Sequence, residues 1–132
     1  MLRIILGISL GLLAVAVQAN SGAEGTWKTE ANDDGGYLEV VVGPCEADAS
    51  KLCGMISKAY SDEGLNPDYE HLGKLMVKNM EADGDNEFSG GTIWDPSADK
   101  VYKSKMQADG NELEVDGCVA FICSGQKWTR VQ

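Results

Sequence analysis

Asp116-Gly-Cys-Val-Ala-Phe-Ile-Cys-Ser-Gly-Gln-Lys-Trp-Thr-Arg-Val131 is the segment around which the chain is organised. It carries two of the four cysteines, Cys118 and Cys123, and it ends in Trp128-Thr129-Arg130. We expect this last segment to be a strand that meets Gly25-Thr26-Trp27, near the start of the domain. The cysteine segment before it is expected to form the corner that leads into the last strand.

Upstream of this stretch, the sequence predicts a series of short strands separated by turns rich in Gly, Asp and Asn. One break occurs at residues 66–72, where Asn66-Pro67 predicts a short helical turn closed by Gly73. About eight strands with almost no helix predict an all-β fold, a small antiparallel up-and-down barrel. A two-sheet sandwich of the same strands is the alternative. The expected strands cover residues 25–30, 37–42, 53–60, 74–81, 88–95, 100–107, 112–116 and 126–131.

The first 19 residues have the features of a secretory signal peptide. Met1–Arg3 is a short positive segment, Ile4–Val17 is almost wholly apolar, and Val17-Gln18-Ala19 has small residues where signal peptidase cleaves. We expect cleavage after Ala19, leaving a single domain over residues 20–132 in the periplasm or outside the cell. A membrane anchor is the alternative, but the apolar run is shorter than the ~20 residues that a spanning helix needs. The first cysteine is Cys45, so no lipid anchor is expected at the cleavage site.

The predicted mature domain is strongly acidic. The full chain has 11 Lys and Arg against 21 Asp and Glu, a formal net charge of −10 at pH 7. Removal of residues 1–19 takes away one base, Arg3, and no acid, so 10 bases face 21 acids and the charge is −11. Such a charge repels phosphate backbones and anionic lipid heads, so nucleic acid and membrane surfaces are poor partners. We expect a monomer with no membrane span after cleavage.

Four cysteines in an exported chain predict two disulfides. Three pairings are open, and the spacing favours Cys45–Cys53 and Cys118–Cys123, because each pair brackets a short loop. A zinc site is the alternative, and the wide spacing of the cysteines disfavours it. A redox pair at Cys118 and Cys123 is also disfavoured, because the sequence is not Cys-x-x-Cys.

Several motifs, taken together and in order, resemble a family of small exported bacterial proteins known as domain of unknown function 2147. The resemblance implies a lipocalin-like barrel and brings no established activity. A Gly-x-Trp on the first strand and an Arg on the last also resemble lipocalins, which implies that Arg130 packs over Trp27 and closes one barrel end. The alternative is that Arg130 binds an anionic ligand. Asp99 stands where the family usually has a glycine. The motifs are Gly25-Thr26-Trp27, Leu52-Cys53-Gly54-Met55-Ile56, Asn66-Pro67, Gly90-Gly91-Thr92-Ile93-Trp94-Asp95-Pro96, Lys100-Val101-Tyr102, Gly117-Cys118 and Trp128-Thr129-Arg130-Val131.

The motifs that could carry catalysis or metal binding have simpler interpretations. His71 is the only histidine, and its loop lacks the Gly-x-Ser-x-Gly context of a nucleophile, so we expect a solvated loop residue. Asp83–Glu87 resembles the start of a calcium loop, but Phe88 replaces the required glycine, which favours a hairpin turn. Among 21 acids no pair stands out for glycoside chemistry. We therefore expect no catalytic residues, no metal site and no cofactor.

The leading functional hypothesis is a non-enzymatic binding module that holds a small apolar or amphipathic ligand inside the barrel. Small eight-stranded barrels either are filled by side chains or hold one such ligand, and the sequence leaves both possibilities open. The second hypothesis is an interaction or inhibitor-type protein that docks a periplasmic partner through its acidic loops, Glu46–Leu52 and Ser61–Leu72. The residues expected to line a ligand site are Trp94, Tyr102, Tyr60 and Met106.

Overall fold

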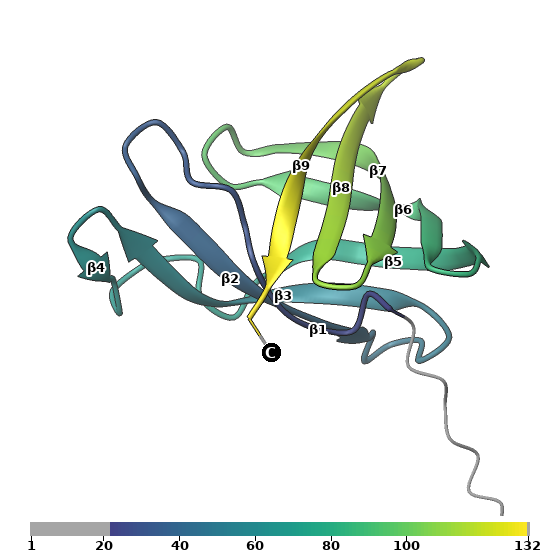
Figure 1. Cartoon of the computed structure of the whole chain (residues 1–132), viewed down its shortest axis with the longest axis horizontal. Helices are drawn as coiled ribbons and strands as arrows, with labels where there is room; N and C mark the ends of the chain where they lie inside the picture. The colour runs from purple at the N-terminus through teal and green to yellow at the C-terminus, as the bar shows by residue number, and fades with distance from the viewer. Residues whose placement is uncertain (1–21, 132) are drawn as a thin grey trace, which may run out of the picture.

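The computed structural model describes residues 22–131, which form nine β-strands (Figure 1). The predicted signal peptide and its cleavage site lie outside the described residues. Residues 22–131 contain no helix long and apolar enough to cross a membrane. The strands are β1 Gly25–Lys28, β2 Tyr37–Pro44, β3 Leu52–Ser61, β4 Gly64–Leu65, β5 Leu75–Gly84, β6 Glu87–Asp95, β7 Lys100–Asp109, β8 Glu112–Val119 and β9 Ile122–Arg130.

Eight of these strands form a closed antiparallel ring, which confirms the predicted barrel. The order around the sheet is β2-β1-β9-β8-β7-β6-β5-β3, and β2 pairs with β3 to close it. The two-residue strand β4 adds to β3 outside the ring. The expected meeting of the last strand with the first is present, with Trp27 opposite Arg130 and Lys28 opposite Thr129. This seam between β1 and β9 is short, because β1 itself has only four residues.

Alternation along the strands fills one end of the barrel with apolar side chains. On β7, Ser104, Met106 and Ala108 are buried, while on β8 Leu113 and Val115 are buried and the acids between and beside them face outward. This is the two-residue period that the sequence predicts for a half-buried strand. The buried cluster also includes Trp27, Val40, Ile56, Val77, Met80, Phe88 and Trp128.

Arg130 closes this filled end. Its guanidinium carbon lies 4.3 Å from the centre of the Trp27 ring. Nη1 donates to the Glu24 carbonyl at 2.9 Å, Nη2 donates to the Gly22 carbonyl at 2.8 Å, and both Nε and Nη2 reach the Gly110 carbonyl at 3.3 and 3.2 Å. One planar group therefore ties the start of the domain, the β7–β8 turn and the last strand together.

Both predicted disulfides are present, at opposite ends of the barrel. Cys45–Cys53 joins the β2–β3 connection at the filled end, and Cys118–Cys123 joins β8 to β9 near the other end. The predicted corner before the last strand is wrong. Cys118 and Cys123 are directly opposite each other in one long hairpin, and β9 begins at Ile122 rather than at residue 126.

The predicted helical turn at residues 66–72 is also corrected. The segment is a run of turns, with Tyr69 N–H bonded to the Asn66 carbonyl and Leu72 N–H to the Tyr69 carbonyl, both at 3.4 Å. Asn66 does accept a backbone bond from Asp68, as a capping residue would, at 3.2 Å. The chain then turns at Gly73, whose φ of 86° is one that glycine adopts readily. The segment crosses the open end of the barrel.

Candidate functional site

The end of the barrel opposite Arg130 is hollow. An inner cavity of about 610 Å³ is lined by β5 to β9, with Met76, Ile93, Tyr102, Val115 and Trp128 among its walls. Ser97, Gly117, Ser124 and Gln126 supply small or polar positions in the same wall. The volume and the mixture of apolar walls with a few polar groups are typical of small-molecule sites.

The cavity exists because inward-facing side chains become small toward the open end. Along β8 the inward positions run Leu113, Val115, Gly117. Gly117 lies opposite Ser104 on one side and Ser124 on the other, so three adjacent strands carry small residues at one level. A Cβ atom at Gly117 would lie 3.3 Å from the Tyr102 Cβ, in the cavity wall. The decreasing size of the inward side chains along β8 is visible in the sequence, but only the strand register brings the three small residues to one level.

A second hollow lies at the barrel mouth and adjoins the first. This mouth hollow measures about 590 Å³ and shares Met76, Asp95, Ser97 and Gln126 with the inner cavity. Its outer wall is the loop at residues 29–36 and the turns at 62–71. A molecule longer than the inner cavity could therefore extend into the mouth.

The mouth hollow is acidic and aromatic. Its described lining contains no Lys or Arg. Tyr37 and Tyr60 stack there, with ring centres 4.6 Å apart and an angle of 14° between the planes. The acids in its wall are Glu30, Asp34, Asp62, Glu70 and Asp95.

Two tyrosines of this wall have raised pKa values. Burial raises the pKa of Tyr69, and the charges of Glu70 and Asp95 raise it further. Burial also raises the pKa of Tyr60, and a hydrogen bond to the Glu39 carboxylate adds to it. Both hydroxyls are protonated at neutral pH, as ordinary tyrosines are, and the raised pKa values extend this state to higher pH.

Trp94 and His71 belong to the rim rather than to the interior. Trp94 is opposite Val101, whereas its neighbour Ile93 is opposite Tyr102, so register places Trp94 on the other face of β6 from Tyr102. Its Nε1 donates to Asp99 Oδ1 at 3.0 Å, and the His71 ring meets it edge-on with centres 4.9 Å apart. His71 Nδ1 accepts from Lys74 Nζ at 3.0 Å. Trp94 still lines the inner cavity from this edge.

The four predicted ligand residues do not form one site. Tyr102 and Trp94 both line the inner cavity, and Tyr60 lies in the wall of the mouth hollow. Met106 is buried in the filled half, and it also reaches an acidic hollow on the outer face of the sheet. The sequence-based prediction of ligand-site residues did not include Gly117, Ser124 and Trp128, and all three line the inner cavity.

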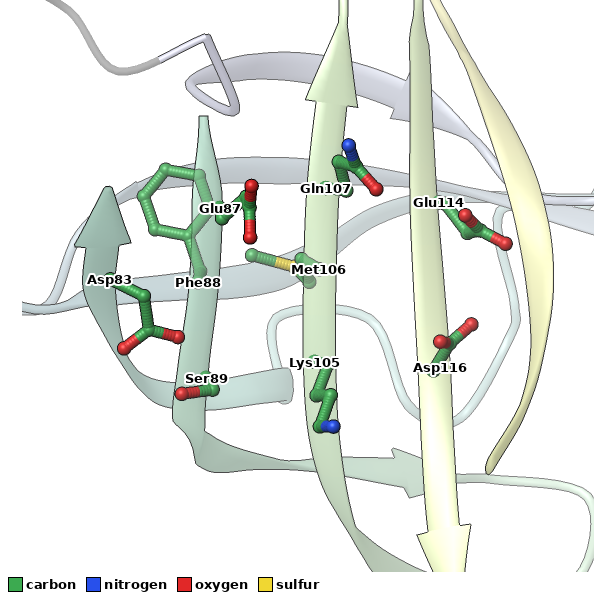
Figure 2. A pocket seen from close by; sticks show the side chains of 9 residues that line it. All are labelled: Asp83, Glu87, Phe88, Ser89, Lys105, Met106, Gln107, Glu114 and Asp116. Atoms are coloured by element: carbon green, nitrogen blue, oxygen red, sulfur yellow. The ribbon is translucent and has the colours of Figure 1, made fainter. Parts of the chain in front are cut away.

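The acidic hollow, of about 340 Å³, lies where β6 bulges between Phe88 and Gly91 (Figure 2). Figure 2 shows that its carboxylates, Asp83, Glu87, Glu114 and Asp116, come from three strands and do not converge on one point. Within residues 22–131 no group of three His, Cys, Asp or Glu is arranged to hold a metal ion. Asn86, with φ of 64°, forms the β5–β6 hairpin turn that was predicted instead of a calcium loop.

The two acidic loops proposed as a docking surface lie at opposite ends of the barrel. Residues 46–51 connect β2 to β3 at the filled end, whereas residues 62–74 follow β3 at the open end. They therefore do not form one face.

Comparison with known proteins identifies the family and the fold. The family model described as "Uncharacterized protein conserved in bacteria", domain of unknown function 2147, matches residues 25–130. A similar solved structure is protein HP1028 from Helicobacter pylori, which is described as belonging to the lipocalin family. It has a TM-score of 0.62 and 16% identity, over 83% of this chain and 82% of that one. A search of curated proteins finds no match. At this identity the structural likeness shows the fold alone.

Proposed function

The chain belongs to the bacterial family of domain of unknown function 2147, and we propose that it is a binding protein that holds a small apolar or amphipathic molecule in its inner cavity. The observation that carries the proposal is the hollow end of the barrel. Aromatic and aliphatic side chains of five strands surround about 610 Å³ there, while the core fills the other end. An apolar molecule that enters this space gains roughly 25 cal/mol for each Å² removed from water.

An amphipathic ligand would place its polar end in the mouth hollow. Five carboxylates line that hollow, and its described wall contains no Lys or Arg. These carboxylates would repel an anionic head group, whereas a neutral or cationic group would find hydrogen-bond acceptors and opposite charge. The site therefore favours ligands with an uncharged or positively charged head.

Binding is tested with N-phenyl-1-naphthylamine, a neutral probe whose emission increases in apolar surroundings. Trp128 lines the inner cavity, so energy transfer from tryptophan to the probe should accompany binding. Native mass spectrometry of the purified protein, offered a lipid extract, identifies what it retains. A protein that retains nothing and gives no rise in probe emission would refute the proposal.

A matched pair of glycine variants places the site. Gly117→Leu puts a side chain into the inner cavity, and we expect it to weaken probe binding at least tenfold. Gly43→Leu is the control, because a Cβ atom there meets nothing within 4 Å and Gly43 is not in the cavity wall. Equal affinity in the two variants would place the probe elsewhere.

The head-group preference has a separate test. Dodecyltrimethylammonium and dodecanoate share an apolar tail and differ in charge, and we expect the cation to displace the probe at lower concentration. Asp95 lines both hollows, so Asp95→Asn should reduce the difference between the concentrations at which the two amphiphiles displace the probe. A preference for dodecanoate would contradict the assignment of the mouth hollow.

We also propose that the protein is exported, with cleavage after Ala19. The two disulfides are compatible with an extracytoplasmic location, because such bonds persist in oxidising compartments. The intact mass of protein from a periplasmic extract tests this. A mass that begins at Asn20 is expected, and a mass that retains residues 1–19 would contradict it.

A further inference from the structure

The tip of the β8–β9 hairpin, residues 119–122, exposes a compact group of apolar side chains. Phe121 is 101% exposed, Ile122 77% and Val119 61%. Every residue from 119 to 127 is exposed, and one face of this hairpin borders the open inner cavity. Figure 1 shows this end of β8 and β9 extending beyond the rest of the barrel. These side chains add nothing to the core, so folding does not account for them.

The local conformation does not account for them either. Ala120 has φ of 56°, a left-handed conformation that hairpin turns usually give to Asn or Gly. The turn is nevertheless Ala-Phe, and the disulfide directly behind it holds the two strands together. Residues that contradict local preference are expected where a function requires them.

The hairpin tip is uncharged, unlike the rest of this acidic protein. Gly117–Gln126 contains no charged residue, in a chain with 21 acids. The neighbouring strand β7 contributes Lys103, which is opposite Cys118. Lys103, Lys105 and Phe121 line a further hollow of about 550 Å³, formed by β6, β7 and the β8–β9 hairpin. The negative net charge predicts weak attraction to anionic membrane surfaces. If the protein approaches with its hairpin tip first, however, the membrane contacts an apolar segment with lysines behind it.

We propose that the hairpin tip inserts into the surface of a phospholipid bilayer and thereby holds the open end of the barrel against it. Val119 and Ile122 also line the inner cavity, so apolar side chains continue from the tip into the barrel. A stable protein interface covers about 800 Å² on each partner, whereas a side chain such as Phe121 offers about 200 Å². A bilayer requires no complementary shape, which suits a small tip.

Flotation with phosphatidylcholine vesicles tests the proposal. We expect the purified protein to float with the vesicles and Phe121→Ser to lower the bound-to-free ratio at least tenfold. Val131→Ser is the matched control, because Val131 is 46% exposed and follows β9 at the filled end of the barrel, away from the hairpin tip, and should change the ratio less than twofold. Phe121→Trp adds a fluorescence readout. The emission of the new tryptophan, taken as the difference from the unchanged protein, should shift to the blue when vesicles are added.

Insertion into the bilayer does not require a ligand in the cavity, so a result that refutes one of the two proposals does not refute the other. Phe121 is not in the wall of the inner cavity, so Phe121→Ser should bind N-phenyl-1-naphthylamine as the unchanged protein does. Absence of flotation, or equal flotation of Phe121→Ser, would overturn the bilayer assignment. A dimer in sedimentation velocity that Phe121→Ser dissociates would instead identify a second copy as the occupant, and would also overturn it.

Discussion

Replacing Arg130 with alanine should destabilise the barrel well beyond an ordinary surface change. The guanidinium lies over Trp27 and donates to carbonyls of Gly22, Glu24 and Gly110. Arg130→Ala removes all of these contacts at once and leaves the indole face open. Lys is a poor substitute, because one ammonium cannot reach three carbonyls that lie in different segments.

The size of the effect follows from these contacts. The two short bonds from Nη1 and Nη2 contribute about 1 kcal/mol each after exchange with water. The stacking on Trp27 adds about 1 kcal/mol at a half-buried position. The terms share one side chain and overlap, so we expect a loss of about 2–3 kcal/mol in unfolding free energy. For a domain of this size that corresponds to a fall in melting temperature of about 10 °C.

Thermal and urea unfolding, followed by circular dichroism, measure this loss. Arg130→Lys should fall between the unchanged protein and Arg130→Ala, and Lys127→Ala, on the same strand and exposed, should stay within about 0.5 kcal/mol. An Arg130→Ala protein with an unchanged melting temperature but no probe binding would refute the structural role and assign Arg130 to the ligand.

Three other perturbations have defined outcomes. Gly91→Ala should cost about 3 kcal/mol in urea unfolding, because its Cβ would overlap the β5 backbone, whereas Gly84→Ala, with open space around it, should change little. Joint replacement of Cys118 and Cys123 by serine should cost about 2 kcal/mol in the same assay, from the loop entropy that the bond removes from the unfolded chain. Because burial raises the pKa of Tyr69, the folded state favours its neutral form, so the stability this contributes is complete below about pH 10 and is lost as pH rises through the raised pKa. Urea midpoints between pH 8 and 11 should show this fall, and Tyr69→Phe should reduce it.

The barrel was predictable because local patterns and the global fold agree. Alternation on β7 and β8 and the turn residues between strands each point to antiparallel neighbours in sequence, and eight such strands close on themselves. The corner at Cys118–Cys123 was not predictable in the same way. Ala120-Phe121 has none of the residues that usually mark a hairpin turn. The sequence therefore contains no indication that the two strands pair as far as Val119 and Ile122.

Asp99, in the turn before Lys100, has a backbone conformation that few residue types favour. It adopts φ of 51°, a conformation that glycine takes without strain and that Asp tolerates better than most residues. Its side chain also gives Trp94 a hydrogen-bond acceptor, since Asp99 Oδ1 accepts from the indole at 3.0 Å. This bond holds Trp94 at the rim.

The site was harder to predict than the fold. The sequence-based prediction included Trp94 and Tyr102 because they are aromatic. A cavity, however, forms where inward-facing side chains are small. The small residues Ser104, Gly117 and Ser124 come from three strands, and only the register brings them to one level. A single sequence shows composition along one strand and not the alignment of neighbours, so the hollow end emerges only from the pairing.

The short seam between β1 and β9 determines the order in which the barrel assembles. All other pairings in the ring join successive strands, except that the two-residue strand β4 lies between β3 and β5. The β1–β9 seam instead joins the two ends of the domain through two residue pairs. Ring closure carries the largest loop entropy for the fewest bonds, so we expect a meander of hairpins to form first and the seam last. The same seam should open first in the native state. Amide hydrogen exchange at Val131, bonded to the Thr26 carbonyl, should then be faster than at Leu113, a fully buried residue of β8. Equal protection at the two amides would show that the barrel opens only as a whole.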